Sequence, residues 1–115
     1  MAHDTCIWTG ASGEKYTFYI WPRHPGVKSG QDGNYIYAKK DAQGRWAPIY
    51  IGQGDLSVRL TTNHHRHDCI EKKGATAVHL HTNAKEADRL SEERDLLKNY
   101  PQAYAPTGCN VKEGG

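Results

Sequence analysis

A chain of 115 residues, 37% of them apolar, can form one domain with a single core, and no apolar run approaches the roughly 18 residues that a membrane-spanning helix needs. No basic and then apolar leader follows Met1, so the sequence argues against a membrane or secreted protein and predicts a soluble, cytoplasmic one. The formal net charge of +2 is too small to indicate a nucleic-acid partner by itself.

The three cysteines, Cys6, Cys69 and Cys109, are odd in number and far apart in the sequence. A disulfide framework in a small domain is usually denser and even in number, and disulfides are rare in the cytoplasm. We therefore expect reduced thiols.

Strand and turn signals fill the first half of the chain. Residues 1–15 are a turn-rich lead-in, and residues 22–33, with two prolines and three glycines, are typical of a loop. Runs rich in aromatic and β-branched residues predict three strands, the last two of them joined as a hairpin by the turn at 41–44. These strands cover residues 16–21, 34–39 and 47–51.

The stretch from Pro48 to Asp55 predicts a strand that ends at glycines in a tight turn and passes directly into a helix capped by Asp55. Such a corner lets backbone amides and side chains approach a phosphate closely. In the helix that follows, Leu56, Leu60 and Asn63 share one stripe, and Arg59 joins them at helical spacing.

The second half of the chain predicts more helix. Residues 64–73 are partly helical and stop at Gly74, residues 75–81 form a fourth strand, and residues 84–99 form a helix that ends before Pro101. Asn83, three residues before Glu86, predicts a capping box at the start of that helix. The order β-β-β-α-(α)-β-α predicts an α+β fold, a small mixed or antiparallel sheet flanked by helices.

Two charged residues at the edges of apolar helix faces admit two interpretations each. Glu93 borders the apolar side of its helix, so its carboxylate is either at the edge of the core or bound to a cation or an arginine. Arg59 either covers Leu56 and Leu60 with its aliphatic stem or turns its guanidinium toward a phosphate at the Tyr50 corner.

A group of histidines lies beside Cys69, and a second pair follows in the fourth strand. None of the spacings matches a standard zinc motif, so a zinc site is the weaker interpretation of this cluster. The histidines are His64, His65, His67, His79 and His81.

Five elements follow one another between residues 33 and 110: Gly33-Asn34-Tyr35, Tyr50-Ile51-Gly52, Arg59, Glu93 and Asn110. In this pattern the chain resembles the GIY-YIG nuclease superfamily, and residues 48–52 are especially similar to the nuclease subunit of bacterial excision repair. Asn34 stands where that family has an apolar residue.

The resemblance implies a domain that hydrolyses phosphodiester bonds with one divalent ion, Mg²⁺ or Mn²⁺. By the resemblance, Tyr35 or Tyr50 helps to activate the attacking water, Arg59 steadies the phosphate, and Glu93 is the only protein ligand of the metal. Asn110 matches a late asparagine of the family. The family's His or Tyr one turn after the arginine falls on Asn63, and we assign its role to the next residue, His64.

These features predict a single domain over residues 1–115, with its core at about 33–110, an N-terminal strand and loop over 1–32 and a flexible tail over 111–115. The expected function is a metal-dependent DNA endonuclease, of a kind that acts in DNA repair. The alternatives are a degenerate domain that binds nucleic acid or protein without cutting, and a zinc-binding module. DNA is the expected partner, and a second protein or a homodimer would help to target it. The basic residues available for this are Lys39, Lys40, Arg45, Arg66, Lys72 and Lys73.

Overall fold

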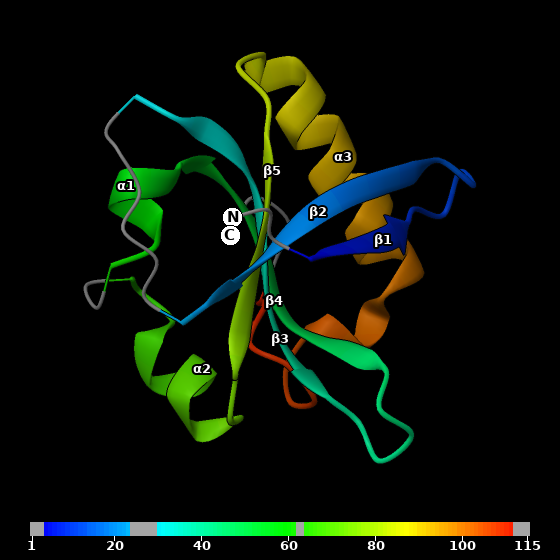
Figure 1. Ribbon diagram of the computed structural model, residues 1–115, viewed down its shortest axis with the longest axis vertical. Coiled ribbons are helices and arrows are strands. Elements are labelled where there is room, and N and C mark those ends of the chain that lie inside the picture. The colour runs from blue at the N-terminus through cyan, green and yellow to red at the C-terminus, as the bar shows by residue number, and fades with distance from the viewer. Residues whose placement is uncertain (1–3, 24–29, 62–63, 112–115) are drawn as a thin grey trace.

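The computed structural model describes residues 4–23, 30–61 and 64–111 (Figure 1). The chain runs through four strands, two short helices, a fifth strand, a long helix and a 3₁₀ turn. These are β1 (Thr5–Thr9), β2 (Lys15–Pro22), β3 (Asp32–Lys40), β4 (Trp46–Asp55), α1 (Leu56–Arg59), α2 (His67–Lys72), β5 (Ala77–Thr82), α3 (Glu86–Asn99) and η1 (Pro101–Ala103). None of the helices in the described ranges is long and apolar enough to cross a membrane.

The five strands form one curled antiparallel sheet in the order β1-β2-β5-β3-β4 (Figure 1). Figure 1 shows α1 and α2 on one side of the sheet and α3 on the other. One core cluster joins Tyr35 and Tyr50 to Leu56 and Ile70 under α1 and α2. The other core cluster packs the opposite face of the sheet against α3 and η1. The sheet therefore separates the two predicted tyrosines from the helix that carries Glu93.

The α+β class is confirmed, but the predicted order lacked one strand. Residues 5–9 form β1, which pairs along its length with β2 from Thr5 opposite Tyr19 to Thr9 opposite Lys15. Its residues, Thr-Cys-Ile-Trp-Thr, include β-branched and aromatic types that favour a strand, and the turn residues that follow it led the sequence prediction to treat the whole segment as a lead-in. Trp8 of this strand is buried in the core under α3.

The predicted tight turn after Gly52 was wrong. Strand β4 continues to Asp55 because β3 begins early enough to pair with it, with Gly33 opposite Gly54 and Asp32 opposite Asp55. The predicted cap is confirmed, since the Asp55 carboxylate accepts a hydrogen bond of 3.0 Å from the amide of Ser57.

The helices are shorter than predicted. Helix α1 has four residues and buries Leu56, whereas Asn63 lies outside the described residues. Helix α3 begins at Glu86 with Lys85 as its N-cap, so the predicted capping box was wrong; the Asn83 side chain accepts from the Lys85 amide instead. Most of the predicted tail, 112–115, and half of the predicted loop, 24–29, are also outside the described residues.

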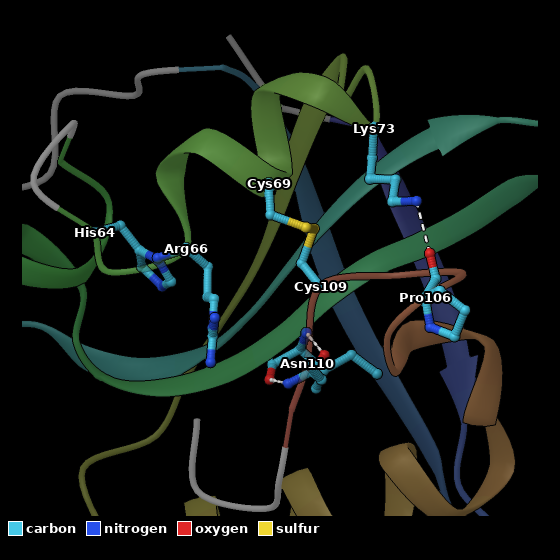
Figure 2. Close-up of a disulfide and its surroundings, with 8 residues drawn as sticks. His64, Arg66, Cys69, Lys73, Pro106, Cys109 and Asn110 are labelled. Atoms are coloured by element: carbon cyan, nitrogen blue, oxygen red, sulfur yellow. Dashed lines mark hydrogen bonds between the residues drawn. A yellow bond between two sulfur atoms is a disulfide. The ribbon is translucent and has the colours of Figure 1, made fainter.

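The expectation of reduced thiols was wrong for two of the three cysteines. Cys69 in α2 and Cys109 form a disulfide, and only Cys6 is a free thiol (Figure 2). The two bonded residues are 40 positions apart in sequence, but their Cα atoms are 5.9 Å apart because α2 and the C-terminal segment meet beside β4. Sequence spacing alone could not show this proximity.

Candidate active site

The two motif tyrosines stack on each other. The hairpin places Tyr35 opposite Gly52 and Tyr37 opposite Tyr50, and the Tyr35 and Tyr50 rings are 5.9 Å apart between centroids with an interplanar angle of 25°. Both tyrosines are 1% exposed. A Cβ on Gly52 would lie 2.5 Å from the Tyr35 hydroxyl, so only glycine at this position leaves room for the ring. The two tyrosines therefore belong to one core cluster on the same face of the sheet.

Arg59 ends α1 and lies back along the end of β4. A Cβ on Gly54, whose φ is +137°, would be 2.9 Å from the Arg59 Nε, so the backbone there lies directly beside the guanidinium. The Arg59 side chain is exposed, yet its positive charge lowers the pKa of both Tyr35 and Tyr50. The arginine thus stands at the solvent side of the tyrosine pair, as a phosphate ligand would need to.

His64 is nearly buried and contacts Tyr35. Its Nε2 lies 2.7 Å from the Tyr35 hydroxyl oxygen, and its Nδ1 accepts a hydrogen bond of 2.9 Å from the Arg66 amide. Burial is the main cause that lowers the His64 pKa to about 4, and the nearby charges of His65 and Arg59 act in the same direction. His64 is therefore neutral at pH 7. Figure 2 shows His64 and Arg66 together on the segment that leads into α2.

His65 reaches the other tyrosine, a contact that the sequence prediction did not assign. Its Nε2 lies 3.4 Å from the Tyr50 hydroxyl oxygen, and its ring stacks on His64 at 4.6 Å and 16°. His65 is exposed, whereas His64 is not. The signal in the sequence was the histidine pair itself, but only the path of the loop decides which ring reaches which hydroxyl.

Glu93 is 1% exposed and extends from α3, on the far side of the sheet. Its negative charge raises the pKa of Tyr35 and Tyr50, so the carboxylate lies within electrostatic reach of both hydroxyls. Burial is the larger cause at both tyrosines and, with Glu93, takes the Tyr50 pKa to about 12. Glu93 therefore acts on the tyrosine pair through its charge, from the helix on the opposite side of the sheet.

Asn34, the departure from the family motif, helps to hold α3 in place. Its side-chain amide donates to the carbonyl of Arg89 at 3.0 Å, and the Arg89 Nε donates to the Gln53 side chain at 3.1 Å. Arg89 is one helical turn before Glu93. The polar residues at these three positions therefore fasten the start of α3 to β3 and β4, which sets the place of Glu93.

Asn110 does not face the tyrosine hydroxyls. Its side-chain amide donates to the Ile51 carbonyl and accepts from the Ile51 amide, both at 2.9 Å, and the residue is fully buried (Figure 2). The Cys109 amide also donates to the Ile49 carbonyl at 2.8 Å, so the C-terminal segment is bonded to β4 at two neighbouring places. Asn110 thus supports the strand that carries Tyr50.

The predicted residues divide into two groups. Tyr35, Tyr50, Arg59 and Glu93 act on one another electrostatically, with His64 bonded to Tyr35, whereas Asn110 supports them from the edge of the sheet.

A hollow of about 900 Å³ lies elsewhere, between β2, β5 and α3. His81 lines it and is bonded at 2.9 Å to Glu92, whose hydrogen bond raises the His81 pKa. None of the predicted site residues lines this hollow.

The cluster of histidines around Cys69 does not assemble as a zinc site. Cys69 is bonded to Cys109 and so offers no thiolate, and both ring nitrogens of His64 are engaged. In the part of the chain that the structure describes, no three His, Cys, Asp or Glu side chains lie together as a metal cage.

Comparisons of the chain with protein-family models, with curated proteins and with solved structures found no match.

Proposed function

We propose that this protein is a metal-dependent endonuclease that hydrolyses DNA phosphodiester bonds with a site of the GIY-YIG kind. The observation that carries the proposal is the stacked pair of Tyr35 (β3) and Tyr50 (β4), on which the charges of Arg59 of α1 and Glu93 of α3 both act. Two phenols, a guanidinium and a carboxylate are the groups that positioning a water, binding a phosphate and holding a hard cation require.

Glu93 would hold the metal ion. A buried carboxylate whose charge reaches both tyrosines is a hard oxygen ligand, and Mg²⁺ is commonly bound by one or two carboxylates together with waters and substrate oxygens. The chain therefore offers a donor set that fits Mg²⁺ or Mn²⁺ and does not fit a closed protein cage. When bound, the ion would supply positive charge for the phosphate oxygens in the transition state.

Arg59 would bind the phosphate. It is the exposed cation at the tyrosine pair, and a guanidinium pairs with phosphate oxygens through two parallel hydrogen bonds. The tyrosines below it are held by packing, because Gly52 lies under the Tyr35 ring and His64 is bonded to its hydroxyl. Once the site opens to solvent, a rigid pair of this sort would keep a water in one orientation.

One observation favours a second candidate, a domain that binds nucleic acid or protein without cutting it. Tyr35, Tyr50 and Glu93 are each only 1% exposed, so a water and a metal ion reach them only if the site opens. The endonuclease remains the better account, because a carboxylate kept at the tyrosine pair in such burial has a large desolvation cost that binding alone does not explain.

The exposed cations on the β3–β4 hairpin would help to engage DNA. Lys39, Lys40 and Arg45 are exposed there, with Lys40 over the ring of Trp46 at 5.3 Å. With a net charge of only +2, non-specific affinity is modest, and a second protein or a second copy of the chain would aid targeting.

Cleavage assays test the proposal. Plasmid, single-stranded and branched DNA are incubated with Mg²⁺ or Mn²⁺ and the wild-type protein, and the loss of intact DNA is measured. Glu93→Gln and Arg59→Ala are expected to lower the rate by at least about 100-fold, the size of effect that removing a metal ligand or a transition-state charge produces.

The matched control is Glu92→Gln, the same change one residue earlier on the same helix, where the carboxylate bonds to His81 outside the site. It should cut within a few fold of the wild type. Equal cutting by the wild type and Glu93→Gln would refute the catalytic assignment. DNA binding without cutting on every substrate would support the second candidate instead.

A further inference from the structure

In the hydrogen bonds that lead from Arg66 through His64 to Tyr35, each donor and acceptor can be assigned. The Arg66 amide donates to Nδ1 of His64, so this nitrogen carries no hydrogen. A neutral imidazole must then carry its hydrogen on Nε2, and burial keeps His64 neutral by lowering its pKa to about 4. Nε2 therefore donates to the Tyr35 hydroxyl oxygen across the 2.7 Å contact. His64 is a donor to Tyr35 and cannot take a proton from it.

The hydrogen bond between Tyr35 and Tyr50 continues this series. Because the Tyr35 oxygen accepts from His64, the Tyr35 hydroxyl hydrogen is available to another acceptor. The two tyrosine rings stack at 5.9 Å, and a side-chain hydrogen bond joins their hydroxyls, in which the free hydrogen of Tyr35 would point to the Tyr50 oxygen.

The last member of this series of hydrogen bonds is His65. The Tyr50 hydroxyl lies 3.4 Å from Nε2 of His65, and this ring is exposed while its neighbour His64 is buried. An exposed imidazole can take a proton and pass it to solvent. The groups that face the two stacked histidines are Tyr35, Tyr50 and Tyr37, with the charges of Arg59, Arg66 and His67 nearby.

We propose that His65 is a further catalytic residue, which accepts the hydroxyl proton of Tyr50 while Tyr50 takes a proton from the attacking water. This rests on the proposed endonuclease function. The water O–H bond breaks and its proton goes to the Tyr50 oxygen; the Tyr50 O–H bond breaks and its proton goes to Nε2 of His65. The water oxygen forms a bond to phosphorus, the bond from phosphorus to the leaving oxygen breaks, and the leaving oxygen is protonated by solvent.

This relay resolves a difficulty in the site. The Tyr50 side chain is almost completely buried, and burial disfavours a phenolate. A phenol that passes its own proton on as it receives another need not ionise in advance. Proton transfer by a positioned side chain contributes about 10²- to 10⁴-fold to a rate.

Two substitutions at one position test the relay in the enzyme. His65→Gln keeps a hydrogen-bond acceptor that cannot take a proton, and His65→Phe keeps a ring with neither ability. Both are expected to lower kcat by about 100-fold on a DNA that the wild type cuts, with the affinity for DNA changed less than about twofold. His67→Gln, on the same segment, is the control and should retain the wild-type kcat. Wild-type kcat in His65→Gln, or a loss of DNA affinity that accounts for the whole effect, would overturn the proposal.

A measurement without substrate separates this proposal from the proposed function. Nitrogen-15 NMR at pH 8 should show His65 with an unprotonated Nε2 whose shift changes in Tyr50→Phe, and His64 with a protonated Nε2. A protonated Nε2 on His65, insensitive to Tyr50→Phe, would overturn the relay even in an enzyme that cuts DNA. A protein that cuts no DNA but shows the expected shifts would refute the endonuclease, and with it the relay's catalytic role, while leaving the direction of the hydrogen bonds established.

Discussion

Asn110 pairs with both backbone groups of Ile51, the residue between Tyr50 and Gly52 in the sequence motif. A side chain here takes the place of a neighbouring strand at the edge of β4, and it does so next to the disulfide that joins Cys109 to α2. The strand that carries Tyr50 is therefore held on one side by β3 and on the other by the C-terminal segment.

Asn110→Ala should lower the free energy of unfolding by about 2–4 kcal/mol, because it removes two hydrogen bonds and leaves the buried amide and carbonyl of Ile51 without that partner. Urea denaturation followed by circular dichroism measures the change. Asn99→Ala removes one exposed hydrogen bond, from Asn99 to the Thr9 carbonyl, and should cost less than about 1 kcal/mol. Equal losses in the two variants would contradict the role given to Asn110.

Removal of the disulfide should also destabilise the protein. The bond closes a loop with a sequence separation of 40 residues, and constraints of this length contribute about 2–4 kcal/mol, largely by restricting the unfolded chain. The double variant Cys69→Ser with Cys109→Ser, or the wild type in dithiothreitol, should unfold at lower urea than the oxidised wild type. Cys6→Ser is the control, since Cys6 is a free thiol, and its oxidised form should match the wild type. An unchanged midpoint on reduction would show that the bond does not form in solution.

Gly52→Ala should disturb the tyrosine pair. The added methyl would lie 2.5 Å from the Tyr35 hydroxyl and must displace a buried ring, which costs about 1–3 kcal/mol. The fluorescence and near-ultraviolet circular dichroism of the tyrosines should change with it. Gly44→Ala is the comparison. It strains the backbone, because Gly44 has a φ of +78°, but the added methyl would have no atom within 4 Å and so would displace no side chain. Gly44→Ala should therefore leave the near-ultraviolet spectrum unchanged, and an unchanged spectrum in Gly52→Ala would contradict the packing described.

Acid should destabilise the fold through two buried histidines. Burial lowers the pKa of His64 and of His79 to about 4, below the ordinary value of 6.5, so the unfolded chain binds protons that the folded protein does not. Their contribution to stability is complete above pH 6.5 and is lost as the pH falls from there toward 4. Each histidine contributes about 3 kcal/mol over that range, at 1.36 kcal/mol for each pH unit of displacement.

Urea unfolding at several pH values from 7.5 to 4.5 measures this slope. His79→Gln should flatten it, because the ring that accepts from Trp8 at 2.9 Å then no longer titrates. His81 acts in the opposite direction, since the Glu92 hydrogen bond raises its pKa and its contribution is present below pH 6.5 and lost as the pH rises. His81→Gln should therefore steepen the slope, and a steeper slope in His79→Gln would contradict the assignment.

Several features of the candidate site followed from the sequence. The hairpin of aromatic and β-branched residues and the N-cap at Asp55 depend on local periodicity and on turn residues, which neighbouring positions determine. The place of Glu93 at the border of an apolar helix face left open whether its carboxylate lies at the edge of the core or binds a cation or an arginine, and its almost complete burial was not predicted.

Only the tertiary structure decided the rest. The pairing of β2 with β5, the disulfide between residues 69 and 109, and the bond from Asn110 to Ile51 depend on segments that are distant in sequence and meet only after the sheet and helices pack. The same holds for the path of the loop that turns His64 to Tyr35 and His65 to Tyr50. Residue types and spacing indicate which groups the chain carries, but the direction of each hydrogen bond around Tyr50 is set by contacts that no local pattern records.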